Sequence, residues 1–541
     1  MRVLLEFTTL NYKMWHSMAK HLKEIYPGSC FAGIVGYAPG ADQGLKFLRT
    51  QKDIEYEFLE VWHEVRNKAF TSEIDFEALK RFEESTPYKS LWRMIAADRN
   101  YGYAFIHDAV WTRSFLIDNA TKENILRSFS GILKHCRELL DRFKPDLFLP
   151  AAAMGGIEVY IFEQLCKERG IIYAVPATCR IEDIFAFAHN KYSIFPQIED
   201  MYKKSLHGRM SLDLSKGERL YEKLIADFKN NQFFDRKNKS FQIQKLHRWS
   251  AKCQYLVGTL GTVVRECREW WKGSPLRKSQ DIRRQTNNFR SFWSNLKFTL
   301  ARRYHNYCHL LNPKFGVRLP LNQKYLYFPL HMTPELSTHI QGTMWLDQIH
   351  LIESLAKSIP ADWVVYVKEH PATLNYRSRP FNFYRQIQKY PNVVIAPIDM
   401  DMHELISNAQ MVAVITGTTG WEAILRGIPV IHFGQCYWDI LGLSRRCSNL
   451  DRLAVDIHEE YLQSKNIPPE ERRRRLIHFL AAVSEGGFRI TYVQQYGYNA
   501  PATDEQFEHI GGELAQNLVQ YLDYINRERE KRDDLVNATP R

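Results

Sequence analysis

Two short segments place polar side chains at the ends of predicted strands, where ligands bind in open α/β sheets. His370 follows the apolar run W-V-V-Y-V-K (363–368), and Pro371 turns the chain away from the sheet. A ring nitrogen in that position can hydrogen-bond a phosphate or protonate a leaving group. Lys368 adds a cation suited to phosphate if its side chain points inward, although a lone histidine and a surface lysine are more often structural.

The second segment is the turn Gly417-Thr418-Thr419-Gly420, which follows an apolar strand and opens a predicted helix. Free backbone N–H groups, hydroxyls and the positive helix end meet there and favour an anion such as phosphate. The alternative is an ordinary strand-to-helix turn with Thr419 as the N-cap. Glu422, near the start of the helix, either accepts hydrogen bonds from ribose hydroxyls or only stabilises the helix.

An acidic pair, Glu182 and Asp183, follows the predicted strand 171–175 in the first part of the chain. Such carboxylates can act as a general base or bind an acceptor hydroxyl, so the pair is the candidate on the acceptor side. A loop with solvated charges is the alternative. The predicted catalytic set is therefore His370, Glu182 and Asp183.

The elements that must position these residues form two alternating series of strands and helices. In residues 1–200, runs such as R-V-L-L-E-F and D-L-F-L-P-A-A-A alternate with amphipathic stretches, which is typical of a parallel sheet with helical crossovers. A second series begins near residue 324, with predicted strands at 325–330, 363–368, 392–396, 411–415 and 429–433. The predicted fold class is α/β, with two Rossmann-like domains facing a cleft.

The chain divides into four predicted parts, and its 541 residues suit two or three domains. Residues 1–204 form an acceptor-side Rossmann-like domain, and residues 321–490 form the nucleotide-binding one. Between them lies a basic, aromatic helical insertion or connector at 205–320. Residues 491–541 form a helical tail.

Positive charge is concentrated in residues 236–314, which hold 18 Lys and Arg against three acids, while the whole chain carries +12. Interleaved aromatic residues suit an anionic membrane surface, where such rings sit at the headgroup level. Single-stranded nucleic acid could bind such a segment, but no nucleic-acid motif accompanies it, so no nucleic-acid partner is expected. A solvated helical face is the third interpretation.

Nine scattered cysteines without a C-x-x-C pair predict reduced thiols in a cytoplasmic protein, and neither a disulfide framework nor a zinc site. The start M-R-V-L-L-E-F-T-T-L is typical of a first strand rather than a secretory signal. No stretch approaches the roughly 20 apolar residues of a membrane span, so an integral membrane protein is not expected.

Four motifs, taken in order, resemble the bacterial capsule polysaccharide biosynthesis family. They are K-E-H-P (368–371), P-N-V-V-I-A-P (391–397), H-E-L-I-S-N-A (403–409) and V-I-T-G-T-T-G-W-E-A-I-L-R-G-I-P-V-I-H-F-G-Q-C-Y-W (414–438). That family includes Kdo transferases that build the glycolipid linker of capsules, and it has a GT-B glycosyltransferase fold. The resemblance is strong over 325–438, weak over 1–200 and absent over the basic segment.

The resemblance implies that His370-Pro371 and Thr418-Thr419 contact the phosphate of a nucleotide sugar, commonly CMP-linked, with Glu422 near the ribose. It also implies a metal-independent glycosyltransferase that acts on a glycan or glycolipid acceptor of a capsule or related surface polysaccharide. The expected location is cytoplasmic, or peripheral at the inner face of the bacterial inner membrane. The nucleotide sugar is then a substrate, and no cofactor or metal is expected.

Two other classes of protein fit the same residues. A non-catalytic component of polysaccharide assembly or export would keep the fold and bind a glycan or nucleotide without transfer. A sugar-nucleotide epimerase of related fold would form product without any acceptor.

Overall fold

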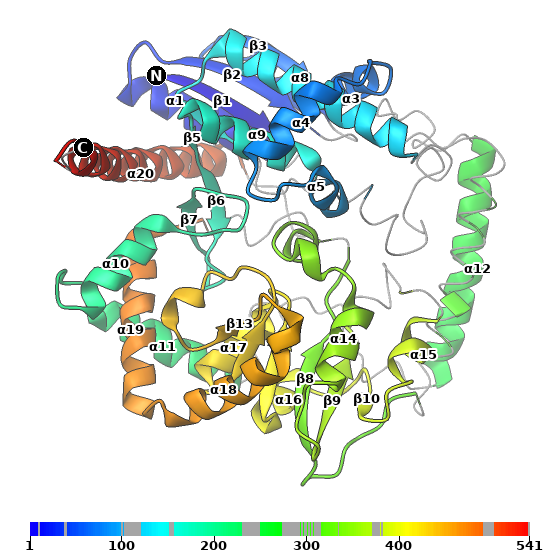
Figure 1. Cartoon of the computed structure of the whole chain (residues 1–541). Helices are drawn as coiled ribbons and strands as arrows, with labels where there is room; N and C mark the ends of the chain where they lie inside the picture. Colours follow the sequence, from blue (N-terminus) through cyan, green and yellow to red (C-terminus); the bar gives the residue numbers. More distant parts are fainter. Residues whose placement is uncertain are drawn as a thin grey trace.

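The computed structural model has two α/β halves joined by a small antiparallel sheet (Figure 1). It describes residues 1–8, 11–36, 41–98, 101, 121–150, 156–229, 249–272, 315–333, 335–370, 379, 382–490 and 503–538, with isolated positions between 293 and 307. Each half contains a parallel sheet with helices packed on both faces. This arrangement confirms the predicted α/β, GT-B-like fold class.

The first sheet has the order β3-β2-β1-β4-β5, with parallel neighbours throughout. Its strands are β1 (Arg2–Phe7), β2 (Cys30–Val35), β3 (Tyr56–Val61), β4 (Leu147–Leu149) and β5 (Ile172–Tyr173). Both faces of β1 are buried because its apolar side chains alternate between two layers, as a period of two residues requires. The run R-V-L-L-E-F therefore forms the predicted first strand.

Helices cover the two faces of this sheet. Leu4 packs in the same layer as residues of α8 (Lys122–Phe143) and α9 (Ile157–Arg169). Val3 and Leu5 face the other layer, which contains residues of α1 (Tyr12–Ile25) and α20 (Asp504–Ala538). The remaining described helices of this half are α2 (Ala41–Thr50), α3 (Trp62–Ala69), α4 (Phe76–Ser85) and α5 (Leu91–Ala97).

The second sheet has the order β10-β9-β8-β11-β12-β13 and is also parallel. Its strands are β8 (Lys324–Pro329), β9 (Trp363–Lys368), β10 (Val393–Ile395), β11 (Met411–Val414), β12 (Val430–His432) and β13 (Arg445–Arg446). The five strands predicted in this half are therefore confirmed, with ends that differ by a residue or two. β13 was not predicted, because a pair of arginines carries no strand pattern.

The helices of the second half also form two layers. One layer contains α16 (Met402–Asn408), α17 (Thr418–Leu425) and α19 (Pro469–Gly486), and the other contains α14 (Gln348–Ala356), α15 (Phe383–Ile387) and α18 (Leu453–Asn466). Short helical turns lie at η5 (Leu336–Ile340), η6 (Thr343–Trp345), η8 (Asp439–Leu441) and η9 (Leu450–Arg452). Within the described part of the chain, none of the helices has the length and hydropathy of a membrane span.

The chain passes between the halves through a three-stranded sheet. β7 (Ile184–Ala188) pairs antiparallel with both β6 (Val175–Thr178) and β14 (Phe488–Arg489). β7 leads into α10 (Pro196–Leu206), and β14 returns the chain from α19. Both crossings therefore run side by side.

The segment expected to be an insertion begins on the second half. The predicted boundary at residue 204 lies inside α10, and both α10 and α11 (Leu214–Lys229) pack against α19. Gly217 of α11 shows how closely the helices approach, because a Cβ there would lie 2.9 Å from the backbone nitrogen of Ala481. Further along, α12 (Trp249–Lys272) lies at the edge of the molecule, and most of 236–314 lies outside the described residues (Figure 1).

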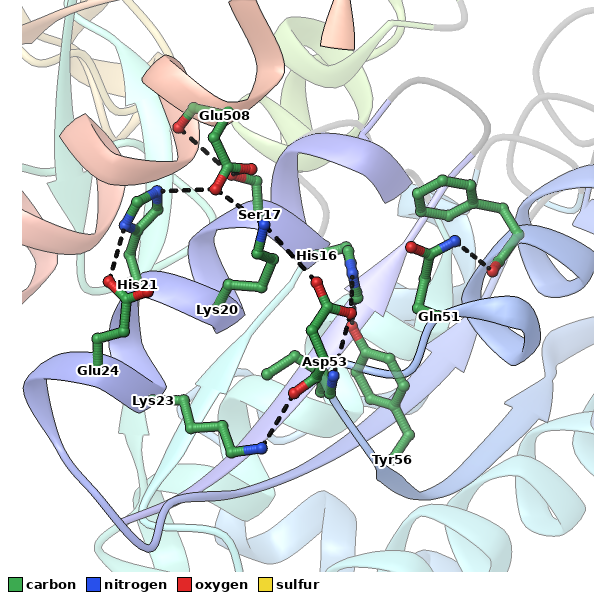
Figure 2. Close-up of polar contacts among 12 residues, drawn as sticks. His16, Ser17, Lys20, His21, Lys23, Glu24, Gln51, Asp53, Tyr56 and Glu508 are labelled. Carbon is green, nitrogen blue, oxygen red and sulfur yellow. Dashed lines mark hydrogen bonds and ion pairs between the residues drawn. The ribbon is translucent and has the colours of Figure 1, made fainter. Parts of the chain in front are cut away.

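The C-terminal helix α20 packs along α1 and so joins the first half. Figure 2 shows Glu508 of α20 beside α1, where its carboxylate accepts hydrogen bonds from Ser17 (3.0 Å) and Lys20 (2.9 Å). Lys20 also approaches Asp53 (3.6 Å), whose carboxylate lies 3.1 Å from Nε2 of His16. Polar contacts at the rim thus continue from α20 through α1 to the loop before β3, while apolar residues fill the space below.

Two neighbouring glycines of α20 test this packing. A Cβ at Gly511 would lie 2.5 Å from Cβ of Ser17 and 2.7 Å from the backbone nitrogen of Met18, whereas a Cβ at Gly512 would have no atom nearer than 3.4 Å. We expect Gly511→Ala to lower the free energy of unfolding by about 1–3 kcal/mol. Gly512→Ala should be neutral or stabilising by up to about 1 kcal/mol. Urea unfolding of both variants measures the difference, and equal values would contradict the close approach.

Candidate functional site

The ends of three strands of the second sheet meet where the strand order reverses. β9 and β10 lie on one side of β8, and β11, β12 and β13 lie on the other. Open α/β sheets bind ligands outside the carboxyl ends of the strands at such a switch point. His370 follows β9 and the turn Gly417–Gly420 follows β11, so the two predicted segments flank the end of β8.

His331 follows β8 and lies between the two segments. Its Nε2 accepts a hydrogen bond from the backbone N–H of Ile415 (3.2 Å), and a Cβ at Gly417 would lie only 2.8 Å from the same nitrogen. Gln348 pairs with both backbone groups of His331, at 2.8 and 3.0 Å. The turn therefore needs glycine at 417 because the imidazole occupies the space of a side chain.

The imidazole of His331 is neutral at physiological pH. Its pKa is lowered to about 3, first by burial and then by the positive charges of Arg379 and His370, against the opposing carbonyl of Pro329. Since Nε2 accepts a hydrogen bond, the ring proton resides on Nδ1. Nδ1 is buried, and the carbonyl of Pro329 is the acceptor beside it. The site thus contains a buried ring N–H close to His370.

A buried carboxylate fixes the backbone of His370. Glu369 accepts hydrogen bonds from Nε of Arg379 (2.6 Å), the hydroxyl of Tyr384 (2.6 Å) and the N–H of His370 (2.7 Å). Arg379 also donates to the carbonyl of His331 (2.9 Å), so one guanidinium connects the ends of β8 and β9. Burial raises the pKa of Glu369, but Arg379 and these hydrogen bonds outweigh it and hold the pKa below its usual value.

The turn after β11 presents backbone groups at the start of α17. Gly417 is the N-cap of α17, so the interpretation of Thr419 as the N-cap is wrong. Because glycine has no side chain, no side-chain hydrogen bond caps this end of the helix. Thr419 is the second residue of the helix, and its buried hydroxyl points to the sulfur of Met402 (3.7 Å). The Thr418 side chain is half-buried, whereas Thr419, Gly420 and Trp421 of the same turn are buried.

Glu422 is buried one turn into α17. Its Oε2 lies 3.6 Å from Nδ1 of His403, which is the second residue of α16, and Arg426 contacts the same histidine at 2.6 Å. A carboxylate, an imidazole and a guanidinium therefore form a compact polar group behind the turn. This group is available for ribose hydroxyls only if a ligand reaches past Thr418.

The remaining residues of the predicted donor site differ in exposure. Lys368, the last residue of β9, is buried, and its carbonyl accepts the N–H of Leu330 (2.8 Å). His370 is exposed. Pro371 lies outside the described residues.

The acidic pair of the first half is not part of this group. Glu182 forms ion pairs with Lys223 and with Arg489 (2.8 Å), and Asp183 forms an ion pair with Arg489. Burial raises the pKa of Glu182, but the two cations outweigh this effect and lower it. These contacts connect β6, β7 and β14, where the chain passes between the halves. The catalytic role of both carboxylates stays a prediction.

The first half contacts the segment that lies next to the site. The hydroxyl of Tyr160 on α9 donates to the carbonyl of Ile340 (3.3 Å), and the amide of Gln341 donates to Oγ of Ser193 (3.3 Å). Thr416, just before the turn, donates to the carbonyl of Ser337 in η5 (2.9 Å). Residues 336–341 therefore connect the switch point to the first half.

The sequence predicted the two flanking segments, whose functional role stays a prediction, but not His331, Arg379 and Tyr384, which lie beside them. His331 had a usable signal, because P-L-H-M-T follows the predicted strand 325–330 in the same way that E-H-P follows 363–368. No sequence signal marks Arg379 and Tyr384, since nothing in their spacing indicates that both side chains reach Glu369.

Residues 297–459 match the family described as "Capsule polysaccharide biosynthesis protein". The matched segment contains His331, Glu369, His370 and the turn after β11, so the resemblance stated from the four motifs is confirmed there. A curated relative, the capsule polysaccharide modification protein LipB of Neisseria meningitidis serogroup A, is 25% identical over 99 residues. These residues are 18% of this chain, and they span about a quarter (24%) of the length of that relative.

Solved structures with a similar arrangement include both transferases and epimerases. KpsC of Thermosulfurimonas dismutans, a beta Kdo 2,7 transferase, is 12% identical, with a TM-score of 0.33 over 70% of this chain and 89% of that one. A UDP-GlcNAc 2-epimerase from Neisseria meningitidis is 11% identical, with a TM-score of 0.24 over 90% of this chain and 99% of that one. Similarity at this level carries no argument about activity.

The Glu369 cluster has a testable effect on stability. Tyr384→Phe removes one donor from the buried carboxylate and should lower the free energy of unfolding by about 1–3 kcal/mol. The stability that comes from the lowered pKa of Glu369 is present above its usual value of 4.5 and is lost as pH falls through the folded-state pKa. Loss of a donor raises that pKa, so acid unfolding should begin at a higher pH, which urea unfolding along a pH series measures.

Tyr390→Phe is the matched control for this variant. Its hydroxyl interacts with Glu353 at the surface, so stability and the acid limb should stay nearly unchanged. If the two phenylalanine variants behaved alike, the hydrogen bond to Glu369 would not support the fold.

Proposed function

We propose that the protein is a glycosyltransferase that moves a sugar from a nucleotide sugar to an acceptor in the synthesis of a bacterial capsule or related surface polysaccharide. The observation that carries the proposal is the meeting of His331, His370 and the turn 417–420 at one switch point, within the segment that matches the capsule biosynthesis family. A CMP-linked donor is the first candidate.

The chemistry of transfer accounts for the groups at this point. When the bond between the sugar and the nucleotide breaks, negative charge builds on the leaving phosphate. Donors fixed before the reaction stabilise this charge most effectively, because they need not reorganise. The N–H groups at the start of α17 and the ring of His370 are the proposed donors, and Lys368 and Arg379 add positive potential behind them. The proposed transfer step therefore uses no metal ion.

The nucleoside is proposed to extend from Thr418 and Thr419 toward Glu422. In this position the carboxylate can accept hydrogen bonds from ribose hydroxyls, with His403 and Arg426 holding it in place. A nucleotide sugar spans both the phosphate and the ribose positions. The residues of α17 would thus read the nucleotide rather than the sugar.

The acceptor is proposed to approach from the first half, which contacts residues 340–341 beside the site. For Glu182 or Asp183 to remove a proton from an acceptor hydroxyl, the ion pair with Arg489 must open first. Arg489 belongs to the crossing strand β14, so a change in the angle between the halves is the motion that could open it.

Exchange of His370 tests the donor site. We expect His370→Ala to keep its fold, because the side chain is exposed, and to lose about 10²–10³-fold in turnover. His350→Ala, which removes an exposed histidine from α14, is the control and should retain activity. Donors are identified first by thermal shift with CMP, UDP, GDP and their sugars, since a ligand that binds only the folded state raises its stability. Near-normal turnover of His370→Ala would exclude the leaving-group role.

Product analysis separates the alternatives to transfer. Conversion of a nucleotide sugar without any acceptor would identify an epimerase instead. Binding of CMP without turnover, over a range of glycan and glycolipid acceptors, would favour a non-catalytic assembly component.

We further propose that α12 attaches the enzyme to the inner face of the bacterial inner membrane, beside a lipid-linked acceptor. Apolar residues of α12 are exposed at helical spacing: Leu256, Val257, Leu260, Val264 and Trp271, which is 85% exposed. Arg265 and Arg268 are exposed on the same helix, and the surrounding segment 236–314 is strongly basic. An apolar stripe beside cationic residues is the pattern of helices that lie in an anionic bilayer surface.

Leu260→Glu tests this attachment. Leu260 is exposed in the free protein and would be buried in the bilayer surface when α12 binds the membrane. The change replaces this apolar side chain with a negative charge, so binding to phosphatidylglycerol vesicles should fall by about tenfold or more. Leu321→Glu is the control, because Leu321 is fully exposed outside the stripe. Vesicle sedimentation measures both variants, and equal binding of Leu260→Glu and the unmodified protein would exclude α12 as the anchor.

A further inference from the structure

Three metal-binding side chains come together beyond the end of β12. His432 ends the strand, Cys436 lies in the following loop and Asp439 begins η8. One ligand atom from each residue lies within 4.8 Å of the other two. His432 and Cys436 are buried, and one third of the Asp439 side chain is exposed. The spacing is H-x3-C-x2-D, a pattern outside the C-x-x-C pairs on which the sequence argument against zinc relied.

The hydrogen bonds of His432 determine which nitrogen faces the group. Nδ1 lies 2.9 Å from the carbonyl oxygen of Gly434, and a carbonyl only accepts, so Nδ1 carries the proton. Nε2 lies 2.8 Å from Oδ1 of Asp439, so a ligand nitrogen and a ligand oxygen already face each other. A proton on Nε2 or a metal ion shared by the two atoms can satisfy this contact.

We propose that His432, Cys436 and Asp439 bind a Zn²⁺ ion. Nitrogen, sulfur and carboxylate oxygen are all zinc ligands, and three protein ligands with water in a fourth position form a common tetrahedral site. The carbonyl of Gly434 orients the imidazole from behind, as outer hydrogen-bond partners do in zinc proteins. The mixed donor set with a thiolate favours zinc over Mg²⁺ and Ca²⁺, which take oxygen ligands.

Binding requires that the thiol lose its proton. Zn²⁺ forms a bond to Sγ of Cys436 as the S–H bond breaks, and the proton leaves to solvent. Zinc binding should therefore release protons and strengthen as pH rises, as for other thiolate sites.

The proposed ion would support the turn of the donor site from its far side. The N–H of Gly434 donates to the carbonyl of Ile415 (2.8 Å), two residues before Gly417. Trp438, between Cys436 and Asp439, lies against Gly420, where a Cβ would be 3.2 Å from its ring. A metal that fixes residues 432–439 would thus fix one wall of the turn. This role is structural and adds no metal to the proposed transfer step.

Metal content of the purified full chain tests the proposal. After growth with added zinc and dialysis, elemental analysis should find about one zinc per chain. Co²⁺ added to the zinc-free protein should give the absorption band of a thiolate–cobalt bond. Cys436→Ser and Asp439→Asn should each weaken zinc binding at least about 100-fold and remove or shift this band. Cys30→Ser, which changes a partly buried cysteine at the start of β2 in the first half, should leave both readouts unchanged.

The results that would overturn the zinc proposal do not depend on whether the proposed donor site binds a nucleotide sugar. Zinc-free protein that takes up neither Zn²⁺ nor Co²⁺, with normal far-UV circular dichroism, would exclude the metal site and leave only the direct contact between His432 and Asp439. Equal zinc binding by the unmodified chain and the two ligand variants would show adventitious metal only. Nucleotide binding, measured separately by thermal shift, does not enter either outcome.

Discussion

A reversal of strand order at β8 is the constraint on which the site depends. Because β9 and β11 lie on opposite sides of β8, the end of β8 is a switch point, and the chain leaving that strand must satisfy its own polar groups. His331 and Gln348 do so through paired backbone hydrogen bonds, and Arg379 extends the network to Glu369. The buried carboxylate of Glu369 is tolerated only because four hydrogen bonds surround it. The reversal of strand order thus creates the switch point and also requires the hydrogen bonds that hold the end of β8 in place.

The sequence predicts those parts of the molecule whose pattern is contained within one short stretch of residues. Strands such as β9 and β11 are apolar runs with polar residues at their ends. The glycines of the turn after β11 indicate that other atoms lie close to the backbone there. Partners that meet only in three dimensions carry no such signal. Asp183 and Arg489 are 306 positions apart, so an exposed-looking acidic loop gave no indication of its ion pair. The role of His331 likewise depends on Gly417, which sequence spacing does not reveal.

The two halves are connected more closely than a linear division of the chain suggests. β7 and β14 carry the two crossings as paired strands, and residues 340–341 provide a second contact beside the site. The ion pairs of Glu182 and Asp183 with Arg489 lie at the crossings. A rotation of the halves would therefore change the switch point and the crossing strands together, which relates Glu182 and Asp183 to the switch point without direct contact.

The position of α20 has a consequence for how the chain acquires its structure. The apolar face of α1, with Trp15, Met18 and Leu22, is buried beneath Leu514 and Leu518 of α20. During synthesis, all of the chain between α1 and α20 must leave the ribosome before this face can be covered. The first half, although translated first, completes its core last, whereas the second half finds all its own strands within one continuous stretch. Of the two halves, the one translated first is thus the one that waits longer for its cover, exposed to chaperones and proteases.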